Sequence, residues 1–253
     1  MEIITHGLRG KGISDSGYTR MQLQHYQSHA AEWSLAKKNL VVGLFDEHNE
    51  SSIYDVMIEG FDTSNMKMLD FGCGPGRNIV KLSDKFKEID GVDIASRNLE
   101  NAKLWIETNE EKFRPDQTIN LYECNGTDLS LIEGATYDMV YSTIVLQHIP
   151  VHELRLDYFK EFFRVLKPGG WISLQMGYGL GPRSHAITKK YHENAWGVRE
   201  TNGRCDVSID NVDDLQKDII ETVGFKNFSH SLSTPIPENC ETHTHWIYFR
   251  AQK

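Results

Sequence analysis

The sequence has few cysteines, no C-x-x-C pair and no long apolar run. Its four cysteines are scattered along 253 residues, so neither a zinc finger nor a disulfide framework is indicated. No stretch of about 18 consecutive apolar residues is present, and the first residues lack the basic and then apolar pattern of a signal peptide. We therefore expect reduced thiols, no membrane-spanning segment and a cytoplasmic location.

The sequence also has fewer basic than acidic residues. The chain has 27 Lys and Arg against 36 Asp and Glu, which gives a formal net charge of −9. Because binding to a nucleic-acid backbone depends on a basic surface, this balance argues against nucleic acid as the main partner. Length and composition are typical of one large globular domain, or of one domain with additions.

The feature that is present is a glycine-rich loop between an apolar run and a helical pattern. Residues 66–71 predict a strand, Gly72, Gly74 and Gly76 follow at alternate positions, and a helical pattern begins at Asn78. Glycine permits sharp turns and the close approach of a ligand, and the free N–H groups at a helix start offer hydrogen-bond donors. The stretch therefore predicts a strand, a tight loop and a helix that together hold a ligand.

Strands and helices alternate along the following part of the chain. Apolar runs predict strands, and 3.6-residue periodicity predicts helices, over residues 77–86 (helix), 88–94 (strand), 97–107 (helix), 119–124 (strand), 137–142 (strand), 151–166 (helix) and 171–176 (strand). This alternation predicts a parallel sheet covered on both faces. After a helix at 213–223, two expected strands, 225–232 and 242–250, follow without a helix between them, which indicates an antiparallel end.

Two segments do not belong to this alternation. Residues 1–60 are expected to form an N-terminal arm and cap helices: an irregular, glycine-rich stretch over 1–17, then helices over 18–38 and 51–59. The glycine-rich residues at about 177–210 are too many for a simple connection, so we expect an insertion that acts as a lid at the ligand edge.

Four short motifs stand in a fixed order. They are Leu69-Asp-Phe-Gly-Cys-Gly-Pro-Gly76, Gly91-Val-Asp-Ile94, the segment from Tyr137 to His148, and Val165-Leu-Lys-Pro-Gly-Gly170. The set resembles the class I methyltransferases that use S-adenosylmethionine (SAM). The resemblance implies a Rossmann-like, doubly wound α/β domain over residues 61–253, with seven mostly parallel strands and an antiparallel last strand.

The resemblance also implies roles around the methionine and ribose of SAM. Asp70 would lie near the methionyl ammonium, and the three loop glycines would let the backbone pass beside the methionine and ribose. Asp93, about 20 residues beyond the loop, is placed to accept hydrogen bonds from the ribose hydroxyls; a solvated acid at a strand end is the alternative. Ile94, next to it, is assigned to the same site.

Further positions are implied to lie around the adenine and the remaining cofactor wall. Asn125 and Gly126 fall where the family often has an acid and a small residue against the adenine. The carbonyl of Asn125 can accept from the adenine amine, and Asp128 is the alternative acceptor. Ser142 is expected in the cofactor wall, and Tyr26 is expected to contact the cofactor from an N-terminal helix.

Methyl transfer to an oxygen or an ammonium needs a base as well as an aligned acceptor. His148, just after a core strand, is the candidate because imidazole titrates near neutral pH. An imidazole that ties the loop to backbone is the alternative. His243 and His245 share one face of the last strand, but no carboxylate pattern accompanies them, so no metal site is expected.

We interpret the chain as a SAM-dependent methyltransferase that acts on an oxygen or nitrogen of a small metabolite and releases S-adenosylhomocysteine (SAH). A dinucleotide-dependent oxidoreductase is one alternative, because a glycine loop with a downstream acid also serves NAD. The spacing Gly72-x-Gly74-x-Gly76 differs, however, from G-x-G-x-x-G. A non-catalytic SAM-binding scaffold is the other alternative. The sequence indicates neither the methyl acceptor nor the oligomeric state.

Overall fold

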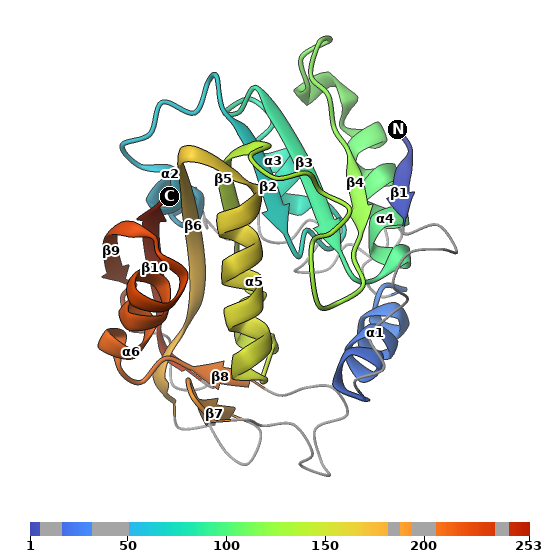
Figure 1. Ribbon diagram of the computed structural model, residues 1–253. Coiled ribbons are helices and arrows are strands. Elements are labelled where there is room, and N and C mark those ends of the chain that lie inside the picture. The colour runs from blue at the N-terminus through green and yellow to red at the C-terminus, as the bar shows by residue number, and fades with distance from the viewer. Residues whose placement is uncertain (6–16, 32–50, 182–187, 194–205, 236–242) are drawn as a thin grey trace.

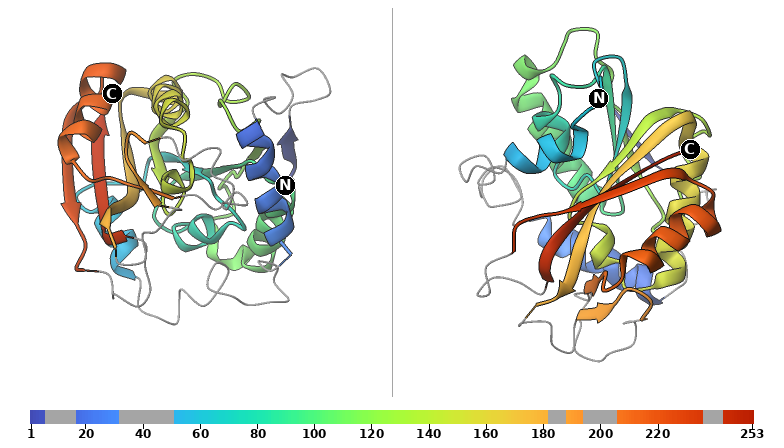
Figure 2. Two further views of the ribbon diagram at one scale, coloured as in Figure 1. Left: turned by 90° about the horizontal axis from the view of Figure 1, so that it is seen from below. Right: turned by 90° about the vertical axis from the view of Figure 1, so that its left-hand side faces the viewer.

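An eight-stranded sheet with helices on both faces forms the body of the protein (Figures 1 and 2). The computed structural model describes residues 1–5, 17–31, 51–181, 188–193, 206–235 and 243–253. The strand order is β1-β4-β3-β2-β5-β6-β10-β9.

The elements are as follows. The strands of the large sheet are β1 (Ile3–Thr5), β2 (Lys67–Phe71), β3 (Glu88–Asp93), β4 (Leu121–Glu123), β5 (Tyr137–Ser142), β6 (Leu166–Leu180), β9 (Lys226–Leu232) and β10 (His243–Gln252). A small parallel sheet pairs β7 (Thr188–Lys190) with β8 (Asp206–Ser208). The helices are α1 (Gly17–His29), α2 (Ser51–Ile58), α3 (Arg77–Lys81), α4 (Ser96–Thr108), α5 (His152–Val165) and α6 (Val212–Lys217), which continues as a π-helix over Asp218–Val223. Short 3-10 helices cover Glu110–Lys112 and Leu146–His148. Within the described ranges, no helix combines the length and the apolar character that crossing a membrane requires.

The predicted fold class is confirmed. Strands β1 to β6 pair in parallel, and β10 runs antiparallel to both β6 and β9. The sheet has eight strands instead of the expected seven, because β1 joins its edge beside β4. The irregular arm expected over residues 1–17 is therefore wrong for 3–5, where Ile3 aligns with Leu121. Residues 6–16 lie outside the described ranges.

Side chains at adjacent positions of the central strands pack on opposite faces of the sheet. Leu69 joins an apolar cluster with Phe162 of α5, whereas Met68 joins a second cluster with Ile79 of α3 and Leu99 of α4. Strand side chains alternate between faces, so a sheet covered on both sides needs apolar residues at consecutive positions. The view from below in Figure 2 shows α5 on one side of the sheet and α3 and α4 on the other.

Several boundaries differ from those expected. Helix α3 ends at Lys81 instead of residue 86, and turns cover residues 82–85. Helix α1 ends at His29; most of the remainder expected up to residue 38 lies outside the described ranges. Strand β6 extends to Leu180 because β10 pairs with it over that length. The insertion therefore begins after Leu180 and not at residue 177, where it was expected. The division of the chain at residue 60 and the role of the insertion as a lid stay predictions.

The chain changes direction across the sheet between β2 and β5. Strands β3 and β4 lie on one side of this pair and β6 on the other. In doubly wound sheets, ligands bind at the carboxyl ends of the strands where such a reversal occurs. Helix α1 and the β7–β8 pair lie beyond the lower end of the sheet in Figure 1, which is the end to which β2 points. This arrangement covers the expected ligand edge.

Candidate active site

A cavity of about 610 Å³ lies at the carboxyl ends of β2, β3 and β5. This volume is within the range of about 300–1,000 Å³ that is usual for small-molecule sites. Its wall is made by the loop after β2, the end of β3, the turn after β4 and the loop after β5, and six residues of α1 also face it. Leu154 and Tyr158 of α5 and Asp206 of β8 complete the lining. The cavity therefore brings together segments that are far apart in the chain.

The glycine loop after β2 lines the cavity with Gly72 and Gly74, whereas Gly76 lies against Ala102 of α4 and outside the lining. Gly72, Gly74 and Gly76 have φ angles of +72°, +51° and +84°. Residues other than glycine rarely adopt such positive angles. A Cβ on Gly72 would lie 2.4 Å from Val145 Cγ2, whereas a Cβ on Gly74 would meet no atom within 4 Å. Gly72 therefore permits close contact with the loop after β5, and Gly74 leaves open space beside the backbone.

Asp93, at the end of β3, ties the glycine loop in place and lines the cavity. Its Oδ2 accepts from the Gly74 N–H at 2.9 Å, and its Oδ1 accepts from the Ala95 N–H at 2.8 Å and from Asn98 Nδ2 at 3.3 Å. Burial raises the pKa of Asp93, and these hydrogen bonds oppose that rise. A carboxylate has about four acceptor positions, so Oδ2 keeps one for a ligand hydroxyl.

Asp70 and Asn78 place unpaired acceptors next to the loop. Asn78 Nδ2 donates to Asp70 Oδ1 at 3.0 Å and to Thr143 Oγ1 at 3.2 Å. Within the described ranges, Asp70 Oδ2 and Asn78 Oδ1 are buried without a hydrogen-bond partner. Burial raises the pKa of Asp70 to about 7 although Asn78 and Arg77 lower it. An unpaired buried acceptor costs about 1–3 kcal/mol, so a ligand with several N–H donors would stabilise this corner.

In the turn after β4, the side chain of Asn125 makes local hydrogen bonds. Asn125 Oδ1 already accepts from the Thr127 N–H, the Thr127 hydroxyl and the Asp128 N–H at 2.8, 3.0 and 3.0 Å. The side chain thus caps its own turn, and Asn125 is not among the residues that line the cavity. This geometry goes against the predicted hydrogen bond from an adenine amine to the carbonyl of Asn125. Gly126 does line it, and a Cβ there would lie 2.3 Å from Thr19 Cγ2 and 2.6 Å from Ile94 Cδ1.

Ser142 is displaced from its expected place by strand alternation. It is fully buried, and its hydroxyl donates to the Phe71 carbonyl at 2.8 Å, which joins the ends of β5 and β2. The next residue, Thr143, faces the cavity. Ile144 follows with a φ of +58°, a strained conformation for a β-branched residue. The cavity wall after β5 is thus made by residues 143–145.

Helix α1 covers the cavity and holds the loop that carries His148. The Tyr18 hydroxyl and Gln22 Nε2 donate to the His148 carbonyl at 2.9 and 2.8 Å. Tyr26 lines the cavity, and its contact with the cofactor stays a prediction. Burial, and then the charges of Asp206 and Asp93, raise the pKa of Tyr26. His25 also lines the cavity, although no sequence pattern distinguished it from the other polar residues of the helix.

His148 faces the cavity and pairs with a carboxylate from the insertion. Its Nδ1 lies 2.6 Å from Oδ1 of Asp206 in β8. Burial lowers the pKa of His148, but the charge and the hydrogen bond of Asp206 outweigh it, so the pKa lies above its usual value. Because Asp206 holds Nδ1, Nε2 is the ring nitrogen left for a reacting group. Asp206 itself was missed, since nothing in the irregular sequence of the insertion marks it.

A second histidine lies behind this pair. His243 Nε2 is 4.0 Å from Asp206 Oδ2, and its Nδ1 is 3.1 Å from the Ser208 hydroxyl. Burial lowers the pKa of His243 to about 4, against the opposing charge of Asp206. His243 is therefore neutral near pH 7. His245 contacts Thr244 Oγ1 instead, so the two histidines of β10 do not form a common site.

Comparison with known proteins agrees with this geometry. Residues 69–174 match the family described as methyltransferase domain. This region is a class I methyltransferase domain. SAM is the cofactor of that family, so the match goes against the oxidoreductase alternative.

Relatives and solved structures extend the match beyond these residues. Arsenite methyltransferase of Rattus norvegicus is 32% identical over 140 residues, which are 53% of this chain and 36% of that protein. The chain thus spans little more than a third of the length of this curated relative. A SAM-dependent methyltransferase from Methanosarcina mazei is similar in structure, with a TM-score of 0.61 and 19% identity over 78% of this chain and 96% of that one. Phosphoethanolamine N-methyltransferase 2 from Haemonchus contortus, in complex with SAM, has a TM-score of 0.59 and 18% identity over 90% of this chain and 60% of that one. Both structures show the same fold.

Proposed function

We propose that the protein is a SAM-dependent methyltransferase that acts on an oxygen or nitrogen of a small molecule. The observation that supports this most directly is the His148–Asp206 pair at 2.6 Å. It faces the same cavity as the glycine loop. A base oriented by a carboxylate, next to a cofactor loop, is the arrangement that proton removal from an acceptor needs.

The cavity residues fit SAM by their hydrogen-bonding capacity. Asn78 lines the cavity, and Asp70 is buried next to it. Their unpaired acceptors, Asn78 Oδ1 and Asp70 Oδ2, suit the N–H donors of the methionyl ammonium. The remaining acceptor position of Asp93 suits a ribose hydroxyl, and Gly126 with Ile94 provides a flat apolar wall for the adenine. When bound, SAM supplies a methyl group on a positively charged sulfonium that is already primed for displacement.

The protein's own residues then handle the proton of the acceptor. His148 Nε2 takes the proton from the O–H or N–H group that receives the methyl. Asp206 holds the proton on Nδ1 and stabilises the imidazolium that forms. Helix α1 fixes the backbone at His148 through Tyr18 and Gln22, which keeps the ring in position.

The acceptor is small in this proposal because it shares the cavity with SAM. About 610 Å³ is available beneath α1 for both molecules. The names of the relatives do not identify the acceptor, since one methylates arsenite and the other the nitrogen of phosphoethanolamine. The base supports an oxygen or nitrogen acceptor, because a hydroxyl or ammonium group must lose a proton, whereas a trivalent arsenic atom or an ionised thiol already has a free lone pair.

Titration calorimetry with SAM, SAH and NAD tests the cofactor. Binding of SAM and SAH without NAD is expected, and the reverse would refute the proposal. Incubation with methyl-labelled SAM and fractionated metabolites then tests catalysis. Transfer of label to a small molecule is expected, whereas SAM binding without any transfer would favour the scaffold alternative.

His148→Ala should slow transfer by about 10²–10⁴-fold and leave SAM affinity nearly unchanged. His230→Ala, at an exposed position of β9, is the matched control.

A further inference from the structure

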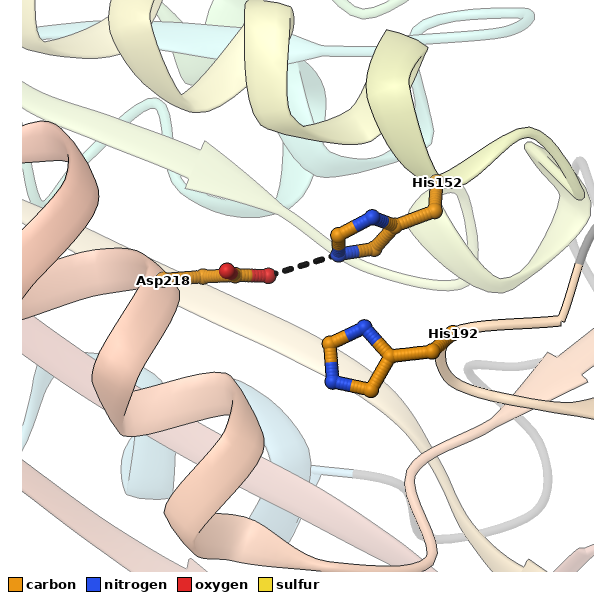
Figure 3. Close-up of side chains that lie close together, drawn as sticks. All are labelled: His152, His192 and Asp218. Carbon is orange, nitrogen blue, oxygen red and sulfur yellow. Dashed lines mark hydrogen bonds and ion pairs between the residues drawn. The ribbon is translucent and has the colours of Figure 1, made fainter.

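A second cluster of polar side chains lies away from the cavity wall, where α5, the segment after β7 and the continuation of α6 meet (Figure 3). His152 is the first residue of α5, His192 follows β7, and Asp218 begins the π-helix. One possible ligand atom from each residue lies within 4.8 Å of the other two. In Figure 3 both imidazole rings extend toward the side on which the Asp218 carboxylate lies.

The partners of the cluster resemble the surroundings of a metal ion. Asp218 Oδ2 accepts from His152 Nε2 at 2.7 Å and from the Tyr191 hydroxyl at 2.8 Å. His192 Nε2 lies 3.6 Å from Asp214 Oδ2. Ligating carboxylates and imidazoles in metal sites are usually oriented by a further hydroxyl or carboxylate. Tyr191 and Asp214 occupy such positions here.

We propose that His152, His192 and Asp218 bind one divalent transition-metal ion of the Zn²⁺ type. Two imidazole nitrogens and one carboxylate oxygen are a donor set that Zn²⁺ prefers, with a water in the fourth position. Mg²⁺ and Ca²⁺ prefer six or more oxygen ligands, which this cluster does not offer. Asp214 and Asp218 together balance the charge of the ion.

The cluster is close to the geometry that a tetrahedral ion requires. Zn–N and Zn–O bonds of about 2.0–2.2 Å place neighbouring ligand atoms about 3.4 Å apart. The His152–Asp218 pair, at 2.7 Å, is shorter than this, whereas the full set extends to 4.8 Å. Small side-chain rotations thus move the atoms to the required distances.

Binding also has a simple proton balance. Without an ion, His152 Nε2–H donates a hydrogen bond to Asp218 Oδ2. A neutral His152 can carry that proton on Nδ1, which frees the Nε2 lone pair for the metal, and a charged His152 releases one proton to solvent.

A bound ion would join three segments that are distant in the chain. His192 belongs to the stretch that follows β7, and β7 pairs with β8, which carries Asp206. The ion would therefore hold this part of the insertion against α5. The side chain of His192 is 48% exposed, compared with 18% for His152 and 10% for Asp218, so the ion can enter from the His192 side.

Zn²⁺ binding to the chelator-treated full chain tests the proposal without SAM or an acceptor, so its outcome is separate from that of the methyltransferase proposal. We expect one Zn²⁺ per chain by calorimetry and by metal analysis of the dialysed protein, and no binding of Mg²⁺ at the same concentration. Co²⁺, used as a coloured substitute, should give the absorption spectrum of a tetrahedral site.

Three variants separate this site from ordinary binding to surface histidines. His192→Ala, at a half-exposed position, should bind Zn²⁺ at least about tenfold more weakly and lose the Co²⁺ spectrum. Asp218→Asn should do the same. His230→Ala removes an exposed imidazole of β9 and should leave both readouts unchanged. The proposal is overturned if the first two variants bind like the parent protein, or if the parent binds no stoichiometric Zn²⁺.

Discussion

Asp206→Asn tests the proposed base directly, because it keeps the size of the side chain and removes its charge. In the parent protein the Asp206 carboxylate holds Nδ1 of His148 at 2.6 Å and raises the pKa of the imidazole above its usual value against the effect of burial. The amide of Asn can still accept a hydrogen bond at this distance. The variant therefore loses the charge while it retains most of the contact.

The size of the effect follows from the kind of hydrogen bond. A hydrogen bond to a charged group contributes about 1.5–3 kcal/mol, compared with about 0.5–1.5 kcal/mol between neutral groups. The His148 side chain is 33% exposed and that of Asp206 is 20% exposed, so solvent screens part of the difference. We expect a loss of about 1–1.4 kcal/mol in the stabilisation of the imidazolium, which is roughly a five- to tenfold lower turnover at neutral pH.

The pH dependence gives a sharper result. His148 must be neutral to accept a proton, so turnover rises with pH through its pKa. Loss of Asp206 lowers the pKa of His148, and the acidic limb of the profile of kcat against pH should move to lower pH. The effect on stability is greatest in acid. An imidazole whose pKa is raised in the folded protein stabilises the fold fully at pH values below its unfolded pKa of about 6.5. The variant should thus be less stable than the parent mainly in acid, and the difference should fade as pH rises through the folded pKa.

The assay is the pH profile of kcat with a labelled acceptor, together with SAM affinity by calorimetry at each pH. Asp210→Asn, which removes a carboxylate that pairs with Lys190, is the control and should leave the profile unchanged. An unmoved acidic limb in Asp206→Asn would refute the role of the pair. A loss of SAM affinity as large as the loss of turnover would show that Asp206 only supports the cavity.

Three further predictions concern the cofactor side of the cavity. Asp93→Ala should weaken SAM and SAH binding by about 1–3 kcal/mol through the lost ribose hydrogen bond, and unchanged affinity in calorimetry would remove Asp93 from the site. Since burial raises the pKa of Asp70 to about 7, SAM affinity should fall as pH drops below that value and the carboxylate takes up a proton; Asp70→Asn should flatten this dependence, and a parent protein whose affinity is constant from pH 6 to 8 would contradict it. Gly72→Ala should lower the free energy of unfolding in urea by about 1–3 kcal/mol more than Gly60→Ala. Both positions have positive φ, but a Cβ meets Val145 only at Gly72, so equal losses would show that the close contact does not matter.

Local pattern was sufficient for the core of the fold. The strand at residues 67–71, the glycine loop and the alternation of strands with helices all follow from short-range periodicity and from the backbone freedom of glycine. The positive φ angles of Gly72, Gly74 and Gly76 are of this kind, because each depends on residues that are neighbours in the chain. The same is true of Asp93, whose place at the end of β3 puts it beside the loop.

Contacts between distant segments were not predictable in this way. Strand β1 has only three residues and becomes a strand because β4 offers it a partner. Asn125 is a different case: it was assigned to the cofactor from its position, but Thr127 and Asp128, two and three residues further on, take up its side-chain carbonyl. Ser142 was expected in the cavity wall, but its hydroxyl donates to the Phe71 carbonyl, and the following residue, Thr143, lines the cavity.

The sequence by itself determined the methyltransferase core, the alternation of its strands and helices and the glycine loop, because hydrophobic periodicity and glycine spacing act over a few residues. Only the tertiary structure decided which groups complete the site. The partner of His148 comes from an insertion 58 residues away, and the ligands of the proposed metal site come from three separate elements. Such pairs depend on how the insertion packs against α5 and the 3-10 helix after β5, and no local pattern in the chain records that packing.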